Sequence, residues 1–353
     1  MPGGRMAVRV LEGGQAEHAL RPLDPRRDLG QVADLIAVAF AGELEPEGQA
    51  ALRDLRAVSR LGPMLSVIGY AGSELSYFYN GFVWVEDGRV VGNVTIQRGD
   101  PYGQRWQIAN VAVYPAYRGR GIGRALMETA LAYIEKQGGS WAVLQVRADN
   151  AVARGLYERL GFEAVSTTNE MRLARVPSAS APPPPLPGLR PRRWSDWRQE
   201  YDLALAATPP LAQWWQPIRS EAFQPSWDAR LVEALAVAIG QRRVIRKGLY
   251  AGGRLLAALD IYAARWPPAH HRLALTVHPE QRGRCEAELI GHALGVLADY
   301  PRRPIHATHP AEHEAAIVAF RAYGFQTVRS LVTMRRWMQG SKAPGERRFL
   351  GYL

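Results

Sequence analysis

The sequence predicts an α/β (α+β) fold that is built twice, each copy a mixed sheet with helices packed on it. Residues 108–113 (IANVAV) alternate like a strand, then run into Pro115 and a glycine-rich turn that opens an amphipathic segment. Residues 273–284 match residues 109–120 nearly position for position. A proline-rich stretch separates the two matching halves. Together these observations favour a duplicated domain over one large domain.

The hydrophobic periodicity of the first half predicts its elements in order. Asp87-Gly88 is a hairpin signal between two apolar runs, and Asp28 is the expected N-cap of the first helix. We expect strands at 19–23, 82–86, 90–97, 105–113, 141–146 and 162–173, and helices at 28–40, 49–60, 123–137 and 151–160.

The second half repeats this plan. Leu189-Arg190-Pro191 restarts where Leu20-Arg21-Pro22 began, Gly252-Gly253 is a second hairpin signal, and residues 319–325 match 156–162. Consecutive prolines form semi-rigid spacers. We therefore expect one domain at 1–176, a linker at 177–188, a second domain at 189–339 and a tail at 340–353.

Length and composition narrow the class of protein. A chain of 353 residues is expected to form two domains. No apolar stretch reaches membrane-spanning length, no signal peptide is evident, and the single Cys285 cannot form an internal disulfide, so we expect a cytoplasmic protein with no membrane partner. The net charge of +11 would attract phosphate groups. Because the arginines are spread along the chain, we expect an anionic cofactor and not nucleic acid.

The glycine-rich turn at 117–124 is the most informative motif. A strand, a turn and a helix in this order direct backbone N–H groups and the positive end of a helix dipole at one point, which suits a pyrophosphate. The glycines permit positive φ angles, and the interleaved arginines add charge. The spacing matches neither a P-loop nor the dinucleotide fingerprint.

The order R-x-x-G-x-G at Arg118, Gly121 and Gly123, after Val-x-Val-x-Pro, resembles the acyl-CoA loop of the GNAT superfamily of N-acetyltransferases. Residues 150–162 resemble that family's second cofactor motif: Asn150, a helix that carries Tyr157, then Gly-Phe. The resemblance covers most of the chain. It implies tandem GNAT domains, each with a mixed, mostly antiparallel sheet, a strand splay and flanking helices.

The resemblance implies an acetyl-CoA-dependent N-acetyltransferase in the first copy, which would transfer an acetyl group to a primary amine. Tyr157 would be the general acid that protonates the departing thiolate; the alternative is a core aromatic beside Phe162. The main chain of Val111 and Val113 would pair with the pantetheine arm, and Asn150 would contact the cofactor. The pyrophosphate would lie on the loop residues Arg118, Gly119, Arg120, Gly121, Ile122, Gly123 and Arg124.

The second copy is expected to be degenerate, because the matching positions lose the required groups. Cys285 stands for Gly121, Glu286 for Ile122, His313 for Asn150, and Phe320, which has no proton to donate, for Tyr157. We read Cys285 as a small residue that fills the loop; a reactive thiol at a helix N-terminus is the alternative. We expect no metal at His306, His309 and His313, because no H-E-x-x-H order is present.

The general base stays open. Many GNAT members carry a glutamate on the strand before the loop, where this chain has Ala109 and Asn110. The remaining candidates are water, Glu74, Glu86, Asp87 and the carboxylate of Leu353. The absence of a base favours an alternative function, a non-catalytic protein that senses acyl-CoA or binds a partner.

The acceptor side and the assembly are also left open. Small-molecule and peptide amines both suit the motifs, and so do acyl groups longer than acetyl. Two fused copies would form a pseudo-dimer within a monomer, and a homodimer is the other option.

Overall fold

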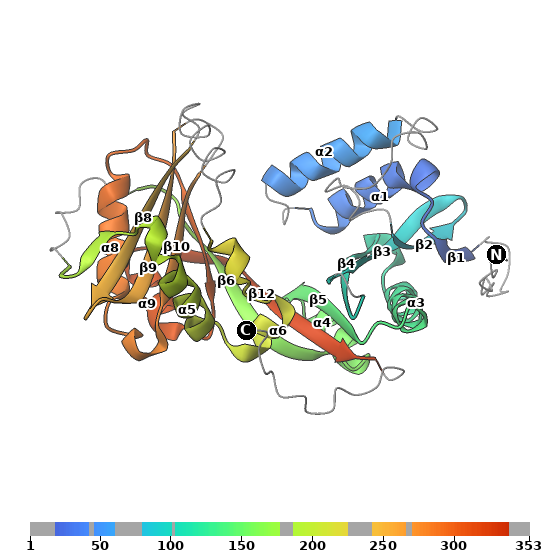
Figure 1. Ribbon diagram of the computed structural model, residues 1–353. Coiled ribbons are helices and arrows are strands. Elements are labelled where there is room, and N and C mark those ends of the chain that lie inside the picture. The colour runs from blue at the N-terminus through green and yellow to red at the C-terminus, as the bar shows by residue number, and fades with distance from the viewer. Residues whose placement is uncertain are drawn as a thin grey trace. The chain divides into compact units, whose positions relative to one another are not determined.

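The chain divides into two compact units, of which a computed structural model describes residues 18–41, 46–60, 80–100, 103–176, 186–224, 242–265 and 270–338 (Figure 1). Unit 1 comprises Met1–Gln145, Val152–Glu163 and Met334–Leu353, and unit 2 comprises Val146–Ala151 and Ala164–Thr333. Residues 177–185 of the expected linker and the expected C-terminal tail lie outside the described residues. No described helix is long and apolar enough to cross a membrane.

Unit 1 is built on a mixed, mostly antiparallel sheet, as the sequence predicts. Its strands follow the order β1-β2-β3-β4-β5, antiparallel at every step except the parallel β4/β5 pair. They are β1 (His18–Pro22), β2 (Gly81–Glu86), β3 (Arg89–Arg98), β4 (Arg105–Val113) and β5 (Trp141–Arg147). The hairpin predicted at Asp87-Gly88 is confirmed: both residues have positive φ angles, 49° and 74°.

Helices cover both faces of this sheet. On one face, α1 (Pro25–Ala39) and α2 (Pro46–Arg60) pack on β2 and β3 through a core that includes Leu29, Leu55 and Val83. On the other face, α3 (Ile122–Lys136) lies on β3 so closely that a Cβ at Gly92 would stand 2.8 Å from Ile122. The helix α4 (Ala151–Arg159) follows β5. The four helices expected in the first half are therefore confirmed.

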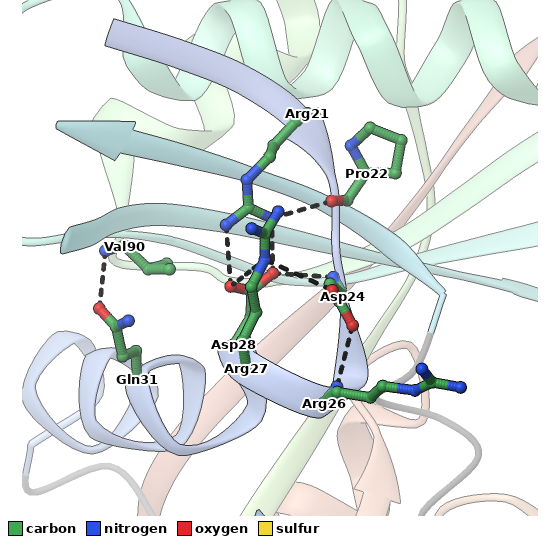
Figure 2. Close-up of polar contacts among 8 residues, drawn as sticks. All are labelled: Arg21, Pro22, Asp24, Arg26, Arg27, Asp28, Gln31 and Val90. Atoms are coloured by element: carbon green, nitrogen blue, oxygen red, sulfur yellow. Dashed lines mark hydrogen bonds and ion pairs between the residues drawn. The ribbon is translucent and has the colours of Figure 1, made fainter. Parts of the chain in front are cut away.

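The N-cap predicted at Asp28 is wrong. The helix α1 begins earlier, and its N-cap is Asp24, whose side chain accepts a hydrogen bond from the Arg26 amide (Figure 2). Asp28 is instead buried in the first turn, where its carboxylate accepts two hydrogen bonds from the Arg21 guanidinium, at 2.6 and 2.8 Å. The ion pair ties β1 to α1, which the sequence pattern alone does not indicate.

The duplication is visible in individual contacts as well as in the sequence. In unit 1, the side-chain oxygen of Gln31 accepts a 2.9 Å hydrogen bond from the amide of Val90 (Figure 2). In unit 2, Gln199 accepts a 2.8 Å bond from the amide of Leu255 in the same way. Each glutamine lies on the first long helix of its repeat, and each amide follows the predicted hairpin. The two repeats therefore share a side-chain clip between helix and sheet.

Unit 2 has the same plan. Its strand order is β12-β6-β11-β10-β9-β8-β7, with β10 and β11 parallel. The strands are β6 (Glu163–Leu173), β7 (Leu189–Pro191), β8 (Arg242–Ala251), β9 (Arg254–Ala264), β10 (His271–Val277), β11 (Ile305–Pro310) and β12 (Gln326–Trp337). The helices are α5 (Trp197–Ala207), α6 (Pro210–Trp215), α8 (Glu286–Leu297) and α9 (Glu314–Ala322). A core that includes Leu289, Phe320 and Ile261 joins α8 and α9 to the sheet.

Each unit is completed by the last strand of the other repeat. The strand β6 belongs by sequence to the first repeat, yet it pairs antiparallel with β11 inside unit 2. The end of β12 belongs by sequence to the second repeat, yet it lies in unit 1, where the Met338 amide donates a 2.9 Å bond to the Ser140 carbonyl. Trp337 packs edge-on against Trp141, with ring centroids 4.6 Å apart. Unit 2 therefore contains the terminal strand of the first repeat, and unit 1 contains the end of the terminal strand of the second repeat.

Candidate functional site

The glycine-rich loop of unit 1 has the strand–turn–helix form that the sequence predicts. After β4, a short 3-10 turn (Pro115–Tyr117) leads into two left-handed residues, Gly119 at φ 79° and Gly121 at φ 81°. Gly121 is the N-cap of α3. Nothing lies within 4 Å of a Cβ placed at either glycine, so their backbone conformation, and not lack of space, favours glycine.

The loop leaves backbone donors available. Within the described part of the chain, no acceptor is found for the amides from Gly119 to Arg124. The first amides of any helix lack intrahelical partners, and the helix dipole adds a partial positive charge at the same point. The sequence-predicted loop residues therefore form a site that can accept an anion.

The arginines of the loop are exposed and point to different partners. Arg118 donates a 3.2 Å hydrogen bond from Nε to the Val113 carbonyl. Arg120 stacks over the Tyr117 ring at 4.9 Å and lies 3.6 Å from the buried carboxylate of Glu86. Arg124 pairs with Glu128 on the same helix at 2.8 Å. The contact with Arg120 places Glu86, one of the base candidates, beside the loop as an ion-pair partner.

A β-bulge interrupts β4 just before the loop. The β3/β4 register shifts between Asn93 and Thr95, and Asn110 takes a positive φ of 50°, which is uncommon for a non-glycine residue. From β3, the Asn93 Nδ2 donates a hydrogen bond to the Asn110 carbonyl at 3.0 Å, and the Thr95 Oγ1 donates one to the Ala109 carbonyl at 2.9 Å. Both Asn93 and Thr95 are fully buried. These two side chains bond main-chain carbonyl groups at the bulge.

The bulge lies where β4 and β5 separate. Their parallel ladder runs only from Arg105/Trp141 to Gln107/Val143, so β4 continues past Gln107 without a partner in β5. The segment from Asn110 to Val113 therefore has main-chain groups on its β5 side that a ligand can meet. Val111 and Val113, expected to pair with the pantetheine arm, lie in this segment.

Asn93 and Thr95 are site residues that the sequence interpretation missed. They lie among the apolar residues 90–96 of β3, where the only signal is that two polar side chains are buried. A buried polar side chain needs a partner, and here the partner is the irregular main chain of β4.

Tyr157 lies on α4 with only 6% of its surface exposed. Burial alone raises the pKa of its phenol to about 12. The ring packs on Phe162, with centroids 6.0 Å apart, so the residue does have the core contact that we considered as the alternative to catalysis. No hydrogen bond to its hydroxyl is found among the described residues. The hydroxyl is therefore protonated and able to donate.

The other expected cofactor residue, Asn150, lies in the turn before α4, within the segment Val146–Ala151 of unit 2. Its amide donates a 3.1 Å bond to the Arg147 carbonyl. Its contact with a cofactor stays a prediction. Of the remaining base candidates, Asp87 lies in the β2–β3 hairpin, and Glu74 and Leu353 lie outside the described residues.

The matching loop of unit 2 has a different backbone. Gly283 keeps the left-handed conformation of Gly119, with φ 83°, but Cys285 has φ −139° where Gly121 has φ 81°. Burial, followed by the charges of Glu286 and Glu288, raises the pKa of the Cys285 thiol to about 12, which excludes a reactive thiolate at neutral pH. The expectation that Cys285 is a small packing residue is thereby favoured.

Unit 2 also lacks the bulge. The β9/β10 ladder runs from Arg272/Tyr262 to Val277/Ala257 without a register shift. Asn93 lies three residues after Val90, and three residues after Leu255 the chain has Ala258, which has no group to donate. In the part of the chain that is described, no three His, Cys, Asp or Glu side chains are placed to hold a metal ion.

Comparison with known proteins gives matches to acetyltransferases. Residues 62–162 match the model of the acetyltransferase (GNAT) family. The chain is 51% identical over 53 residues to the [ribosomal protein bS18]-alanine N-acetyltransferase of Escherichia coli (strain K12), a match that covers 15% of this chain and 36% of that protein. It is 36% identical over 110 residues to the N-alpha-acetyltransferase RimI of Mycobacterium tuberculosis, covering 31% and 66%.

The fold of the whole chain also has a counterpart among solved structures. A tandem GNAT protein from the clavulanic acid biosynthesis pathway, solved without AcCoA, superposes with a TM-score of 0.54 at 20% sequence identity. The superposition covers 93% of this chain and 100% of that protein. At this identity the likeness is one of fold, and it extends over both repeats.

Proposed function

The chain belongs to the GNAT acetyltransferase family through its residues 62–162, and from that premise we propose that it is an acetyl-CoA-dependent N-acetyltransferase whose catalytic site lies in unit 1. The observation that carries the proposal is the loop from Gly119 to Arg124, whose amides lack acceptors in the described chain and whose glycines have left-handed φ angles. This loop would hold the pyrophosphate of acetyl-CoA.

The β4 bulge supports the same assignment. Asn93 and Thr95 fix the main chain of residues 109–110, so that the segment with Val111 and Val113 is held apart from β5. Main-chain groups on this segment would pair with the pantetheine arm and orient the thioester. The bulge is present in the repeat with the open loop and is replaced by a regular ladder in the other repeat.

Tyr157 would donate a hydrogen bond from its phenolic hydroxyl to the sulfur as the thiolate departs. With a pKa of about 12, the phenol is a weaker acid than an ordinary thiol of pKa about 8.5, so its contribution is a hydrogen bond that strengthens as negative charge develops on the sulfur. The departing thiolate would take its proton from solvent. We assign no general base, because neither Ala109 nor Asn110 can accept a proton.

The acceptor is proposed to be a primary amine of a small molecule or a peptide. One relative is named for N-acetylation of an alanine of a ribosomal protein and another for N-alpha-acetylation, which makes a peptide with a free α-amine the first acceptor to test. The matches cover only part of those proteins and less than a third of this chain, so a small amine is tested beside it.

A thiol-release assay with acetyl-CoA tests the proposal. The panel would hold short peptides with free N-termini, the same peptides blocked at the N-terminus, amino acids and small amines. We expect release with at least one free amine and none with its blocked counterpart. The Gly121→Glu variant should release no thiol with any acceptor, because a carboxylate would enter the anion site.

Two observations favour a second candidate, a protein that binds acyl-CoA without turnover. Tyr157 is a weak acid, and the strand before the loop has no base. If calorimetry shows acetyl-CoA binding that Gly121→Glu abolishes, while no acceptor in the panel releases thiol, the binding protein is the better description.

A further inference from the structure

The loop of unit 2 already contains an anion, the side chain of Glu286. Its carboxylate accepts hydrogen bonds from the Gly283 amide at 2.8 and 3.0 Å and from the Cys285 amide at 3.2 Å. Glu286 is the first residue of α8 and is only 2% exposed. The carboxylate thus lies at the helix N-terminus, the place where the matching loop of unit 1 has amides without acceptors.

Two buried histidines continue the hydrogen bonding of this carboxylate beyond the loop amides. His313 Nε2 lies 2.8 Å from Glu286 Oε1, and His309 Nε2 lies 2.8 Å from His313 Nδ1. Both rings are at most 4% exposed. Neutral rings protonated at Nε2 satisfy the whole chain of bonds: His309 donates to His313, and His313 donates to the carboxylate.

In this hydrogen-bonded series of side chains, the negative charge is on the Glu286 carboxylate and the two histidines are neutral. Burial would raise the pKa of Glu286, but the hydrogen bonds from Gly283 and His313, with those from the neighbouring amides, bring its pKa below the ordinary value. Burial lowers the pKa of both His309 and His313, and the nearby Arg282 lowers them further. An ionised glutamate with neutral histidines therefore fits the geometry at neutral pH.

The buried histidine cluster also lies where the strands β10 and β11 are no longer paired. The parallel β10/β11 ladder ends at Leu273/Ala307, just as the β4/β5 ladder ends early in unit 1. His309 lies on β11 beyond this point and packs on Phe320, with ring centroids 5.8 Å apart. Phe320 is the residue that matches Tyr157 in the sequence. Side chains thus occupy the positions that would face a cofactor arm and the catalytic tyrosine.

We propose that Glu286 is a built-in anion that replaces the cofactor pyrophosphate in unit 2, so that this repeat keeps the fold of a cofactor-bound acyltransferase domain without binding a cofactor. The identity of the replaced group rests on the proposed function of unit 1. The charge relationship itself, a carboxylate in a loop made for an anion, rests on the unit 2 contacts alone.

Thermal unfolding tests the proposal without any acetyl-transfer readout. All variants would carry Gly121→Glu, so that the loop of unit 1 does not bind the probe, inorganic pyrophosphate. Glu286→Gln keeps the shape of the side chain and removes its charge, and Glu286→Ala empties the loop. Glu288→Gln is the matched control, because Glu288 is an exposed glutamate in the same first turn of α8.

We expect Glu286→Gln to lower the unfolding temperature by about 5 °C or more, while Glu288→Gln changes it little. Pyrophosphate should raise the unfolding temperature of Glu286→Ala and should leave the parent and Glu288→Gln unchanged. Equal unfolding temperatures for the two glutamine variants would overturn the proposal. So would a Glu286→Ala protein that is destabilised, or even unfolded, and that pyrophosphate does not restore, because the carboxylate would then be a packing group and not a substitute anion.

Discussion

Asn93 Nδ2 donates a 3.0 Å hydrogen bond to the carbonyl oxygen of Asn110, the residue with positive φ at the centre of the β4 bulge. The bond joins a fully buried side chain to main chain that no longer pairs with β3. Unit 2 has neither the bulge nor a donor at the matching position. The bulge and the open loop thus occur together in one repeat and are missing together in the other.

The first prediction concerns Thr95, the second side chain that holds the bulge. Thr95→Val keeps the shape and removes the 2.9 Å bond to the Ala109 carbonyl, leaving that partly buried carbonyl without this donor. We expect a loss of about 1–3 kcal/mol in unfolding free energy and a fall in acetyl-transfer rate of at least tenfold, because the strand that orients the thioester would relax. Steady-state kinetics and urea unfolding measure the two effects.

Thr129→Val is the matched control. Thr129 donates a 2.8 Å bond to the Ala125 carbonyl within α3, away from the bulge. It should lower stability without lowering the rate per folded molecule. If both variants change the rate equally, the bulge has no specific role in orienting the substrate.

The second prediction concerns the hydroxyl of Tyr157. Tyr157→Phe keeps the packing on Phe162, so acetyl-CoA affinity should stay within about twofold. Turnover should fall by roughly 10²-fold if the hydroxyl hydrogen-bonds the departing sulfur. Tyr133→Phe, on α3 beside Phe82 and Trp106, removes a hydroxyl elsewhere in the unit and should leave both constants unchanged. Full turnover by Tyr157→Phe, with chemistry shown to limit the rate, would return Tyr157 to a packing role.

The third prediction follows from the glycine conformations in the loop. Gly121 has φ 81°, whereas a Cβ at Gly123 would meet only Leu156 and Val113 at ordinary contact distances of 3.8 and 3.9 Å. We expect Gly121→Ala to weaken acetyl-CoA binding about tenfold, since the left-handed conformation costs a side chain roughly 1–2 kcal/mol. Gly123→Ala should bind nearly as well as the parent. Calorimetry gives both affinities, and a larger loss at Gly123 would show that ligand approach, not backbone conformation, limits the loop.

Sequence reasoning located the local features well. The hairpins at Asp87-Gly88 and Gly252-Gly253, the strand–turn–helix around Gly121 and the repeat itself depend on residues close in the chain. Each of these features has a local residue pattern that is typical of one backbone conformation. The N-cap at Asp28 was wrong because a neighbouring aspartate, Asp24, competes for the same role, and only the distant Arg21 decides between them.

Strand pairings and side-chain contacts between residues far apart in the sequence could not be predicted in this way. The strands β6 and β12 end equivalent repeats, and nothing in their alternation says which sheet each one joins. Glu286 was expected only to mark a degenerate loop, and its carboxylate instead lies on the loop amides and bonds His313, from a segment far along the chain. Asn93 gave only the signal of a polar residue in an apolar run, since its partner exists only once the bulge has formed.

The fourth prediction concerns the pH dependence of unit 2. Burial, followed by the charges of His313 and Arg282, lowers the pKa of His309 to about 3, well below the unfolded value of about 6.5. Between these values the unfolded chain binds a proton that the folded chain does not. The stability of unit 2 should therefore fall as pH falls from about 6.5, by up to about 1.4 kcal/mol per pH unit for this residue.

Urea unfolding at pH 7, 6 and 5, followed through hydrogen-exchange protection of α8 and α9, measures this dependence. His309→Asn should flatten the slope. His270→Asn, a substitution at a histidine that stacks on His306 at the strand end, should leave it unchanged. A slope that survives in His309→Asn would assign the proton uptake to other groups.

The last prediction concerns the exchanged strand end in unit 1. Trp337 comes from the second repeat, yet its ring packs edge-on against Trp141 of β5, and the adjacent Met338 amide bonds Ser140. Trp337→Ala should therefore reduce hydrogen-exchange protection of β5 and lower the stability of unit 1 by about 2 kcal/mol, since an aromatic contact and its buried area are lost. The unit 2 helices α8 and α9 should keep their protection, because Trp337 and Trp141 belong to unit 1. Trp194→Ala, at an indole that is 47% exposed, is the control and should leave β5 unchanged. Loss of protection in α8 and α9 with none in β5 would mean that the end of β12 supports unit 2 instead, and that unit 1 does not depend on the second repeat for its sheet.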